Sequence, residues 1–120
     1  MHELGIAQSI LELVTETIPP EQLPSIRKVC LLLGPLAGVE RESLEFCFQA
    51  IVRDGPLHSA RLAIESRALL GHCASCGRTS ALERLTLQCP LCDRAPLTLS
   101  GGNELAVTSI ELDDDPVEAT

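Results

Sequence analysis

The sequence predicts an α+β protein: two helices packed on a three-stranded, mainly antiparallel sheet, with an inserted four-cysteine zinc-ribbon module. Apolar residues recur at helical spacing in two segments, and three other segments are aliphatic or alternate between apolar and polar residues, as strands do. Two Cys-x-x-Cys pairs lie in a stretch with few apolar residues. The 120 residues, 45% of them hydrophobic, suffice for one compact domain and a small module.

The two helices are expected at residues 3–18 and at about 40–53. In the first, apolar residues recur at intervals of three and four until Pro19-Pro20 ends the helix. The second has Glu40 and Glu42 near its start, where carboxylates complement the helix dipole. The residues expected to face the core are Leu4, Ala7, Leu11, Val14, Ile18, Leu44, Cys47, Phe48 and Ile51.

Three strands are expected, at residues 26–33, 61–70 and 104–112. The first is an aliphatic run that closes at Gly34-Pro35, which indicates a strand buried on at least one face. The second alternates cleanly and is expected to be half-exposed. In the third, the apolar residues change phase halfway along, which predicts a β-bulge. We expect this last strand to return to the first sheet.

These elements define the expected domains. Residues 1–70 plus 104–113 form an α/β domain, and residues 71–103 form a separate zinc-ribbon module that holds both Cys pairs. Residues 114–120 are acidic with few apolar side chains, which predicts a flexible tail.

The two pairs, Cys73/Cys76 and Cys89/Cys92, are the strongest motif in the sequence. A Cys-x-x-Cys turn lets two thiolates reach one metal ion, and the 12 residues between the pairs suffice for a hairpin that brings them together. A closed shell of four thiolates predicts a structural zinc that stabilises a module with a small core. A thioredoxin-like redox pair and iron in the same shell are the alternatives.

Two further Cys and two of the three His are expected to bind no metal. Cys30 and Cys47 are expected to be small buried hydrophobic residues. His72 directly precedes Cys73 and could replace a thiolate or sense pH, but a side chain facing water is the favoured interpretation. His58 is expected in a solvated loop.

The amino terminus, Met1-His2-Glu3, predicts a second metal site. The α-amine, the backbone amide nitrogen of His2 and its imidazole can close fused chelate rings around one ion, and Glu3 adds a carboxylate. Such nitrogen and oxygen donors favour Ni²⁺ or Cu²⁺. Because the amine and the imidazole must lose protons to bind, the affinity should fall as the pH drops toward 6. Taken alone the motif is weak, since a His near a chain terminus is more often solvated.

Charge and composition argue against several function classes. The net charge of −8 repels phosphate, and two Phe without Trp or Tyr offer few stacking surfaces for nucleic acid. No apolar run reaches the ~18 residues of a membrane span, and no secretory signal is evident, so a cytoplasmic protein is expected. No Ser/His/Asp constellation, phosphate-binding glycine loop or open metal shell is found, so the protein is not expected to be an enzyme.

One further pattern covers nearly the whole chain, from Met1 to about Asp113. It comprises the start MHELGIAQSILELV, the strand ending LLLG, the helix segment SLEFCF, the strand RLAIE, and the Cys-x-x-Cys pairs before a final strand ending SIEL. Together these segments resemble the HypA/HybF family of hydrogenase maturation proteins. The most specific element is the combination of an intact Met-His-Glu start with a late four-cysteine knuckle.

The resemblance implies a nickel metallochaperone that helps to insert Ni²⁺ into the large subunit of [NiFe]-hydrogenase, together with a GTPase accessory protein. It places nickel on Met1 (through its amine), His2 and Glu3, and structural zinc on Cys73, Cys76, Cys89 and Cys92. It also implies two helices against a three-stranded sheet with an inserted zinc ribbon. We expect no nucleic-acid or membrane partner, and a monomer or weak homodimer.

A zinc-ribbon adapter that binds a protein or nucleic-acid partner is the alternative function. Ribbons of this kind commonly serve as adapters, although the acidic balance of the chain weakens the nucleic-acid version. DNA binding that weakens steeply as salt rises would support it.

Overall fold

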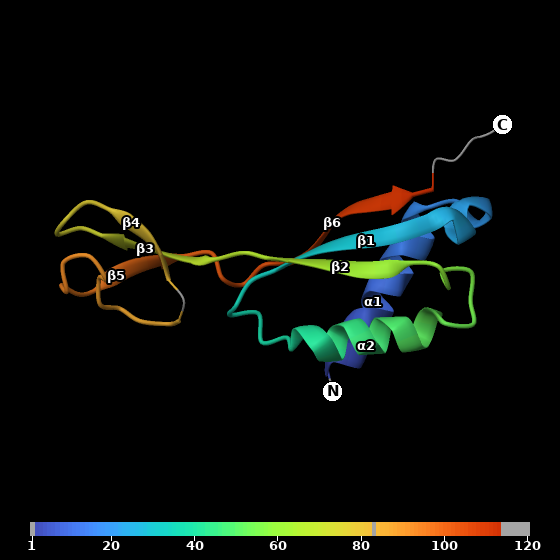
Figure 1. Cartoon of the computed structure of the whole chain (residues 1–120), viewed down its shortest axis with the longest axis horizontal. Helices are drawn as coiled ribbons and strands as arrows, with labels where there is room; N and C mark the ends of the chain where they lie inside the picture. The colour runs from blue at the N-terminus through green and yellow to red at the C-terminus, as the bar shows by residue number, and fades with distance from the viewer. Residues whose placement is uncertain (1, 83, 114–120) are drawn as a thin grey trace. The chain divides into compact units, whose positions relative to one another are not determined.

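The computed structural model describes residues 2–82 and 84–113 (Figure 1). The chain divides into unit 1 (Met1–Leu31, Val39–Glu65 and Ala106–Thr120) and unit 2 (Leu32–Gly38 and Ser66–Leu105). The elements are α1 (His2–Thr17), η1 (Pro20–Ser25), β1 (Ile26–Leu33), α2 (Arg41–Val52), β2 (Arg61–Ser66), β3 (Leu69–Cys73), β4 (Thr79–Leu82), β5 (Leu97–Ser100) and β6 (Leu105–Leu112). The predicted α+β class is confirmed, while the tail predicted at 114–120 lies outside the described residues. No helix in the described part of the chain is long and apolar enough to span a membrane.

The first sheet has the strand order β2-β1-β6. A hydrogen bond from the Asp113 N–H to the Ser25 carbonyl joins the end of β6 to the start of β1, so these strands run antiparallel. A bond from the Arg67 N–H to the Leu33 carbonyl joins the carboxyl ends of β2 and β1, so these run parallel. Helix α2 lies between β1 and β2 in the chain and supplies the crossover that a parallel pair requires.

The core of unit 1 lies between the two helices and one face of this sheet. In β2, Leu62 and Ile64 are buried whereas Arg61 and Glu65 are exposed, so only one face of the strand is covered. The core is aliphatic apart from one aromatic ring. Its buried residues in α1, α2, β2 and the part of β1 that belongs to unit 1 are Ala7, Ile10, Val14, Ile26, Val29, Leu31, Leu44, Phe48, Val52, Leu62 and Ile64. Burial of each larger side chain contributes about 1.5–3 kcal/mol.

The core face predicted for α1 is partly wrong. Leu4 is 39% exposed and Leu11 is half-buried, whereas Ile10 is buried. At 100° per residue, Ile10 lies on one side of Ala7 and Val14, and Leu4 and Leu11 lie on the other. Both sets satisfy the same three-and-four spacing, so the pattern alone could not choose the side that meets the sheet.

Helix α2 begins after Glu40, whose carboxylate accepts a hydrogen bond from the Ser43 N–H at 2.8 Å and so caps the helix. Its buried residues are Leu44, Phe48 and Val52. Cys47 and Ile51 are half-buried, so their assignment to the core is wrong. The buried face follows a strict spacing of four residues, which rotates it away from these two side chains.

The strand predicted at 61–70 is in fact two strands in two different sheets. Strand β2 ends at Ser66, and β3 begins at Leu69. Polar and apolar residues continue to alternate through Arg67 and Ala68. The last buried residue of β2 is Ile64, whereas the next buried residue, Leu69, belongs to the core of unit 2. Alternating polarity therefore predicts extended chain here, but does not reveal that the chain passes from one sheet to another.

The last strand lies nearly where the sequence predicts it. Strand β6 covers 105–112, and its half-buried residues are Val107, Ile110 and Leu112. Val107 and Ile110 are three residues apart, whereas Ile110 and Leu112 are two apart. This is the change of phase seen in the sequence. The strand returns to the first sheet as expected, where it pairs with β1.

Unit 2 contains an antiparallel sheet with the order β4-β3-β5. In its register Leu69 pairs with Leu82, and Cys73 pairs with Leu97. The buried core of unit 2 consists of Leu69, Cys73, Leu82, Cys89 and Leu97. Two of these five residues are cysteines of the predicted metal site, so this core is small without them.

Gly34 is packed where no side chain fits. Its N–H donates to the Glu104 carbonyl at 2.8 Å, and a Cβ at this position would overlap the Gly102 carbonyl oxygen and the Glu104 carboxylate. The same carboxylate accepts a hydrogen bond from the Gly102 N–H at 2.9 Å. These contacts fix the segment after β1 against the segment before β6 within unit 2.

Gly34→Ala is therefore expected to destabilise the zinc-loaded chain by about 1–3 kcal/mol, because the backbone at Gly102 must shift to admit the methyl group. Thermal unfolding followed by circular dichroism measures this change. Gly5→Ala is the matched control: no atom lies within 4 Å of a Cβ at this helical site, so this change should stabilise α1 by about 0.5–1 kcal/mol. Equal effects of the two substitutions would contradict the packing argument.

Candidate metal centres

The four predicted cysteines come together in unit 2. Cys73 ends β3, and Cys89 and Cys92 lie in the loop between β4 and β5. The four sulfur atoms lie within 4.8 Å of one another, with Cys73 Sγ at 3.6 Å from Cys92 Sγ and Cys76 Sγ at 3.8 Å from Cys89 Sγ. Four thiolates around zinc, with bonds of about 2.3 Å at tetrahedral angles, would stand about 3.8 Å apart. The spacing fits one tetrahedral ion.

The two Cys-x-x-Cys turns have the same backbone hydrogen bonds. The Cys73 N–H donates to the Arg78 carbonyl at 2.9 Å, and the Cys89 N–H donates to the Arg94 carbonyl at 2.7 Å. Each pair is thus held in an equivalent knuckle. The shortest sulfur contacts join one knuckle to the other, which favours a shared ion over two separate redox pairs.

Each knuckle closes on a residue in the left-handed region of backbone space. Gly77 has a φ of 75°, and Asp93 occupies the equivalent position with a φ of 66°. Aspartate tolerates this conformation better than most residues with a side chain. The Gln88 side-chain amide donates to the Asp93 carbonyl at 3.2 Å, which ties the second knuckle to the loop before it.

Backbone amides donate hydrogen bonds to two of the four sulfur atoms. The Cys76 N–H donates to Cys73 Sγ at 3.5 Å, and the Leu91 N–H donates to Cys89 Sγ at 3.4 Å. The amide of Cys76, more than any other group, lowers the pKa of Cys73 to about 6, so this thiol is largely ionised at neutral pH. An ionised thiolate is the form that binds metal.

His72 and His58 lie outside this cluster of cysteines. His72 is exposed, and its Nδ1 is 3.0 Å from the hydroxyl of Thr79, its partner in the β3–β4 pair. His58 is also exposed, with Nδ1 at 3.2 Å from the Gly55 carbonyl oxygen. These positions agree with the prediction that both face water.

The prediction that Cys30 and Cys47 are buried is wrong. Both are half-buried. Cys30 alternates out of the core because its neighbours in β1, Val29 and Leu31, take the buried positions, and its Sγ is 4.0 Å from a Glu111 carboxylate oxygen. Cys47 lies at the side of α2 and lines a surface cleft.

The predicted site at the amino terminus is at the start of α1. His2 is the first residue of the helix and its side chain is 61% exposed, whereas Glu3 is only 9% exposed. His2 Nε2 lies 3.8 Å from Glu3 Oε2, so two of the predicted nickel ligands are neighbours. Met1, whose amine is the third, lies outside the described residues.

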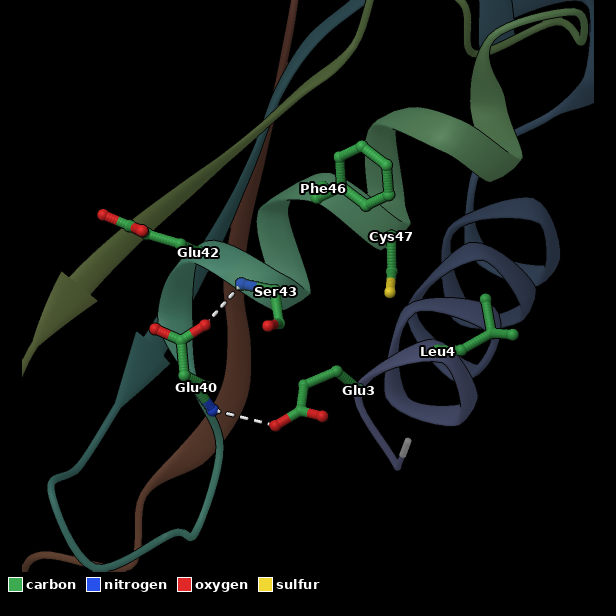
Figure 2. A pocket seen from close by; sticks show the side chains of 7 residues that line it. All are labelled: Glu3, Leu4, Glu40, Glu42, Ser43, Phe46 and Cys47. Atoms are coloured by element: carbon green, nitrogen blue, oxygen red, sulfur yellow. Dashed lines mark hydrogen bonds between the residues drawn. The ribbon is translucent and has the colours of Figure 1, made fainter.

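Glu3 connects the start of α1 to the start of α2. Its Oε2 accepts a hydrogen bond from the Glu40 N–H at 2.9 Å (Figure 2). This bond lowers the pKa of Glu3 to about 2, and hydrogen bonds from Ser43 lower the pKa of Glu40. Both carboxylates are therefore ionised at neutral pH. The sequence identified Glu40 only as a favourable helix start and missed this role.

A cleft of about 430 Å³ opens beside these groups. It is lined by Glu3, Leu4, Glu40, Glu42, Ser43, Phe46 and Cys47 (Figure 2). Three of the seven are acidic, and the Phe46 ring at its edge is 74% exposed. A cation held at the start of α1 would lie next to fixed negative charge and within reach of another protein.

Comparison with known proteins matches the chain to one family. The family model described as "Hydrogenase/urease nickel incorporation, metallochaperone, hypA" matches residues 1–112. A hydrogenase maturation factor HypA from Chlorobaculum parvum is 39% identical over 113 residues, covering 94% of this chain and 100% of that protein. The HypA of Methylocella silvestris is 36% identical with the same coverage.

Two solved structures share the fold. The solution structure of the Ni metallochaperone HypA from Helicobacter pylori has a TM-score of 0.60 and 20% identity, covering 96% of this chain and 100% of that one. A second solution structure of a HypA protein has a TM-score of 0.64 and 20% identity, covering 96% and 98%. At this identity the likeness supports the fold of the chain.

Proposed function

Because the chain belongs to the HypA family of nickel-incorporation metallochaperones, we propose that it binds Ni²⁺ through the Met1 amine, His2 and Glu3 and delivers it for insertion into the large subunit of [NiFe]-hydrogenase. The observation that carries this proposal is the pairing of an exposed imidazole with an ionised, fixed carboxylate at the start of α1. The ion is cargo, so it has to be both bound and released.

The geometry suits a site that gives up its ion. His2 is exposed, so a partner's ligand can approach the ion as the imidazole leaves. Glu3 is held by the Glu40 amide, which keeps the carboxylate in place and charged while the exposed ligands exchange. Transfer by stepwise ligand exchange needs no unfolding of α1. The proposed partners are the hydrogenase large subunit and a GTPase accessory protein, in the cytoplasm.

We assign structural zinc to Cys73, Cys76, Cys89 and Cys92. The sulfur spacing and the amide donors to sulfur support this assignment. Zinc would supply the cross-link that the small core of unit 2 lacks. In functional terms we propose residues 1–70 plus 104–113 as the nickel-binding domain and residues 71–103 as the zinc ribbon.

A calorimetric nickel titration of the zinc-loaded chain tests the proposal. Three forms are compared: the native chain, His2→Ala, and a chain whose Met1 α-amine is acetylated. Acetylation removes the amine as a donor while leaving every side chain present. We expect at least about a hundredfold weaker binding by both altered forms, since each loses one chelate donor. Equal binding by all three would place nickel elsewhere and refute the assignment.

A further inference from the structure

Strand β6 forms one edge of the first sheet. The strand order is β2-β1-β6, and Figure 1 shows β6 on the opposite side of β1 from β2. Within residues 2–82 and 84–113, β6 pairs with β1 alone in this sheet, so alternate backbone N–H and C=O groups of its eight residues point away from the sheet. Such an edge can accept another strand unless something covers it.

The other edge of the same sheet is partly blocked. The Arg41 guanidinium, at the start of α2, donates from Nη2 to the Ile64 carbonyl in β2 at 3.0 Å. This bond occupies an acceptor in the middle of the shorter edge strand and places a charged side chain beside it. Charged side chains at an edge are a common means of blocking strand addition.

An apolar groove runs beside β6. It has a volume of about 390 Å³ and is lined by Leu13, Thr17, Ile18, Val107, Thr108, Ser109 and Ile110. Leu13 is 45% exposed although its helix packs in the core. The Thr17 hydroxyl donates a hydrogen bond to the Leu13 carbonyl. Only the methyl group of Thr17 is therefore left to contact an apolar ligand. A strand added to β6 would place its inward side chains in this groove.

The charge around the groove defines the occupant. Among the described residues, unit 1 contains 11 acidic and 5 basic residues, whereas unit 2 contains 2 and 4. Near the groove, Glu12 and Glu16 are exposed on α1, and Glu111 is exposed on β6. A basic segment would be attracted to this surface. A second copy is disfavoured, because it would bring the same exposed acidic side chains to this edge from both sides.

We propose that β6 binds an extended, basic segment of a partner protein as a fourth strand of the sheet, with alternate apolar side chains in the groove beside α1. Backbone hydrogen bonds supply the pairing, the groove selects apolar residues at every second position, and the acidic surroundings select Lys or Arg between them. The site uses none of the proposed nickel ligands. The proposal can therefore be tested independently of nickel binding.

The test uses the zinc-loaded full chain and a synthetic octapeptide, KVRVKIRV, acetylated and amidated. Binding is measured by calorimetry, and the contact is located by ¹⁵N chemical-shift changes. We expect shifts in β6 and the second half of α1, no binding of the acidic peptide EVEVEIEV, and no binding of KVRVKIRV with every backbone amide methylated. The methylated peptide keeps charge and side chains but cannot donate to a strand.

Leu13→Arg should weaken peptide binding at least about tenfold, because it fills the groove and adds a like charge. Leu87→Arg is the matched control, since Leu87 is a similarly exposed leucine (52%) in unit 2, and it should change the affinity less than about twofold. Equal binding of the methylated peptide, shifts confined to unit 2, or no binding of KVRVKIRV would overturn the proposal. Concentration-dependent dimerisation that Leu13→Arg abolishes would also overturn it, by naming a second copy as the occupant.

Discussion

Cys89→Ser is expected to abolish zinc binding and to unfold unit 2 while unit 1 remains folded. The core of unit 2 has five buried residues, and two of them, Cys73 and Cys89, are proposed zinc ligands. Structural zinc supplies roughly 10–16 kcal/mol of apparent binding free energy in small modules of this kind. A core of three leucines cannot replace that contribution, because each buried leucine stabilises by only about 1.5–3 kcal/mol.

Metal analysis and ¹⁵N spectra check this result. We expect less than one zinc per chain and loss of dispersed signals from residues 66–105, with signals from α1 and α2 retained. Cys47→Ser is the control: it is the same substitution at a half-buried cysteine of unit 1, and it should keep both zinc and the spectrum of unit 2. A Cys89→Ser chain that keeps one zinc and its dispersed unit 2 signals would show that the four thiolates are not the zinc site.

Elements marked by one strong local sequence pattern were predictable from the sequence. The aliphatic run ending at Gly34-Pro35 predicted β1 to the residue, and the acidic start before Leu44 predicted α2 within one residue. The grouping of the four cysteines was predictable for the same reason, since Cys-x-x-Cys spacing limits each pair to one knuckle. In each case the information lies within a few neighbouring residues.

Features set by long-range packing were not predictable. The break between β2 and β3 depends on which core receives Leu69, and the buried side of α1 depends on which of two equivalent stripes meets the sheet. The short helix η1 escapes prediction because Pro19 and Pro20, at its start, indicate only the end of α1. At the amino terminus, the bond between Glu3 and the Glu40 amide joins residues 37 positions apart, and no local pattern indicates it.

Nickel affinity is expected to fall at least about a hundredfold per pH unit in the acidic range where the amine and the imidazole are both protonated in the free chain. Each must release a proton to bind, and each proton contributes about a factor of ten per unit. Glu3 should add nothing to this slope. The Glu40 amide lowers the pKa of Glu3 to about 2, so its carboxylate is already ionised above pH ~4 and its favourable contribution is lost only below that range.

Glu3→Gln separates the charge of this residue from its position. The glutamine side-chain oxygen can still accept the hydrogen bond from the Glu40 N–H, so the start of α1 stays in place. We expect the nickel affinity to be about tenfold lower at every pH, with an unchanged slope, because a carboxylate ligand is lost but no titrating group is removed. Competition titrations at several pH values above 5 measure both quantities. A shallower slope in Glu3→Gln would mean that Glu3 takes up a proton in this range, and an unchanged affinity would remove it from the nickel site.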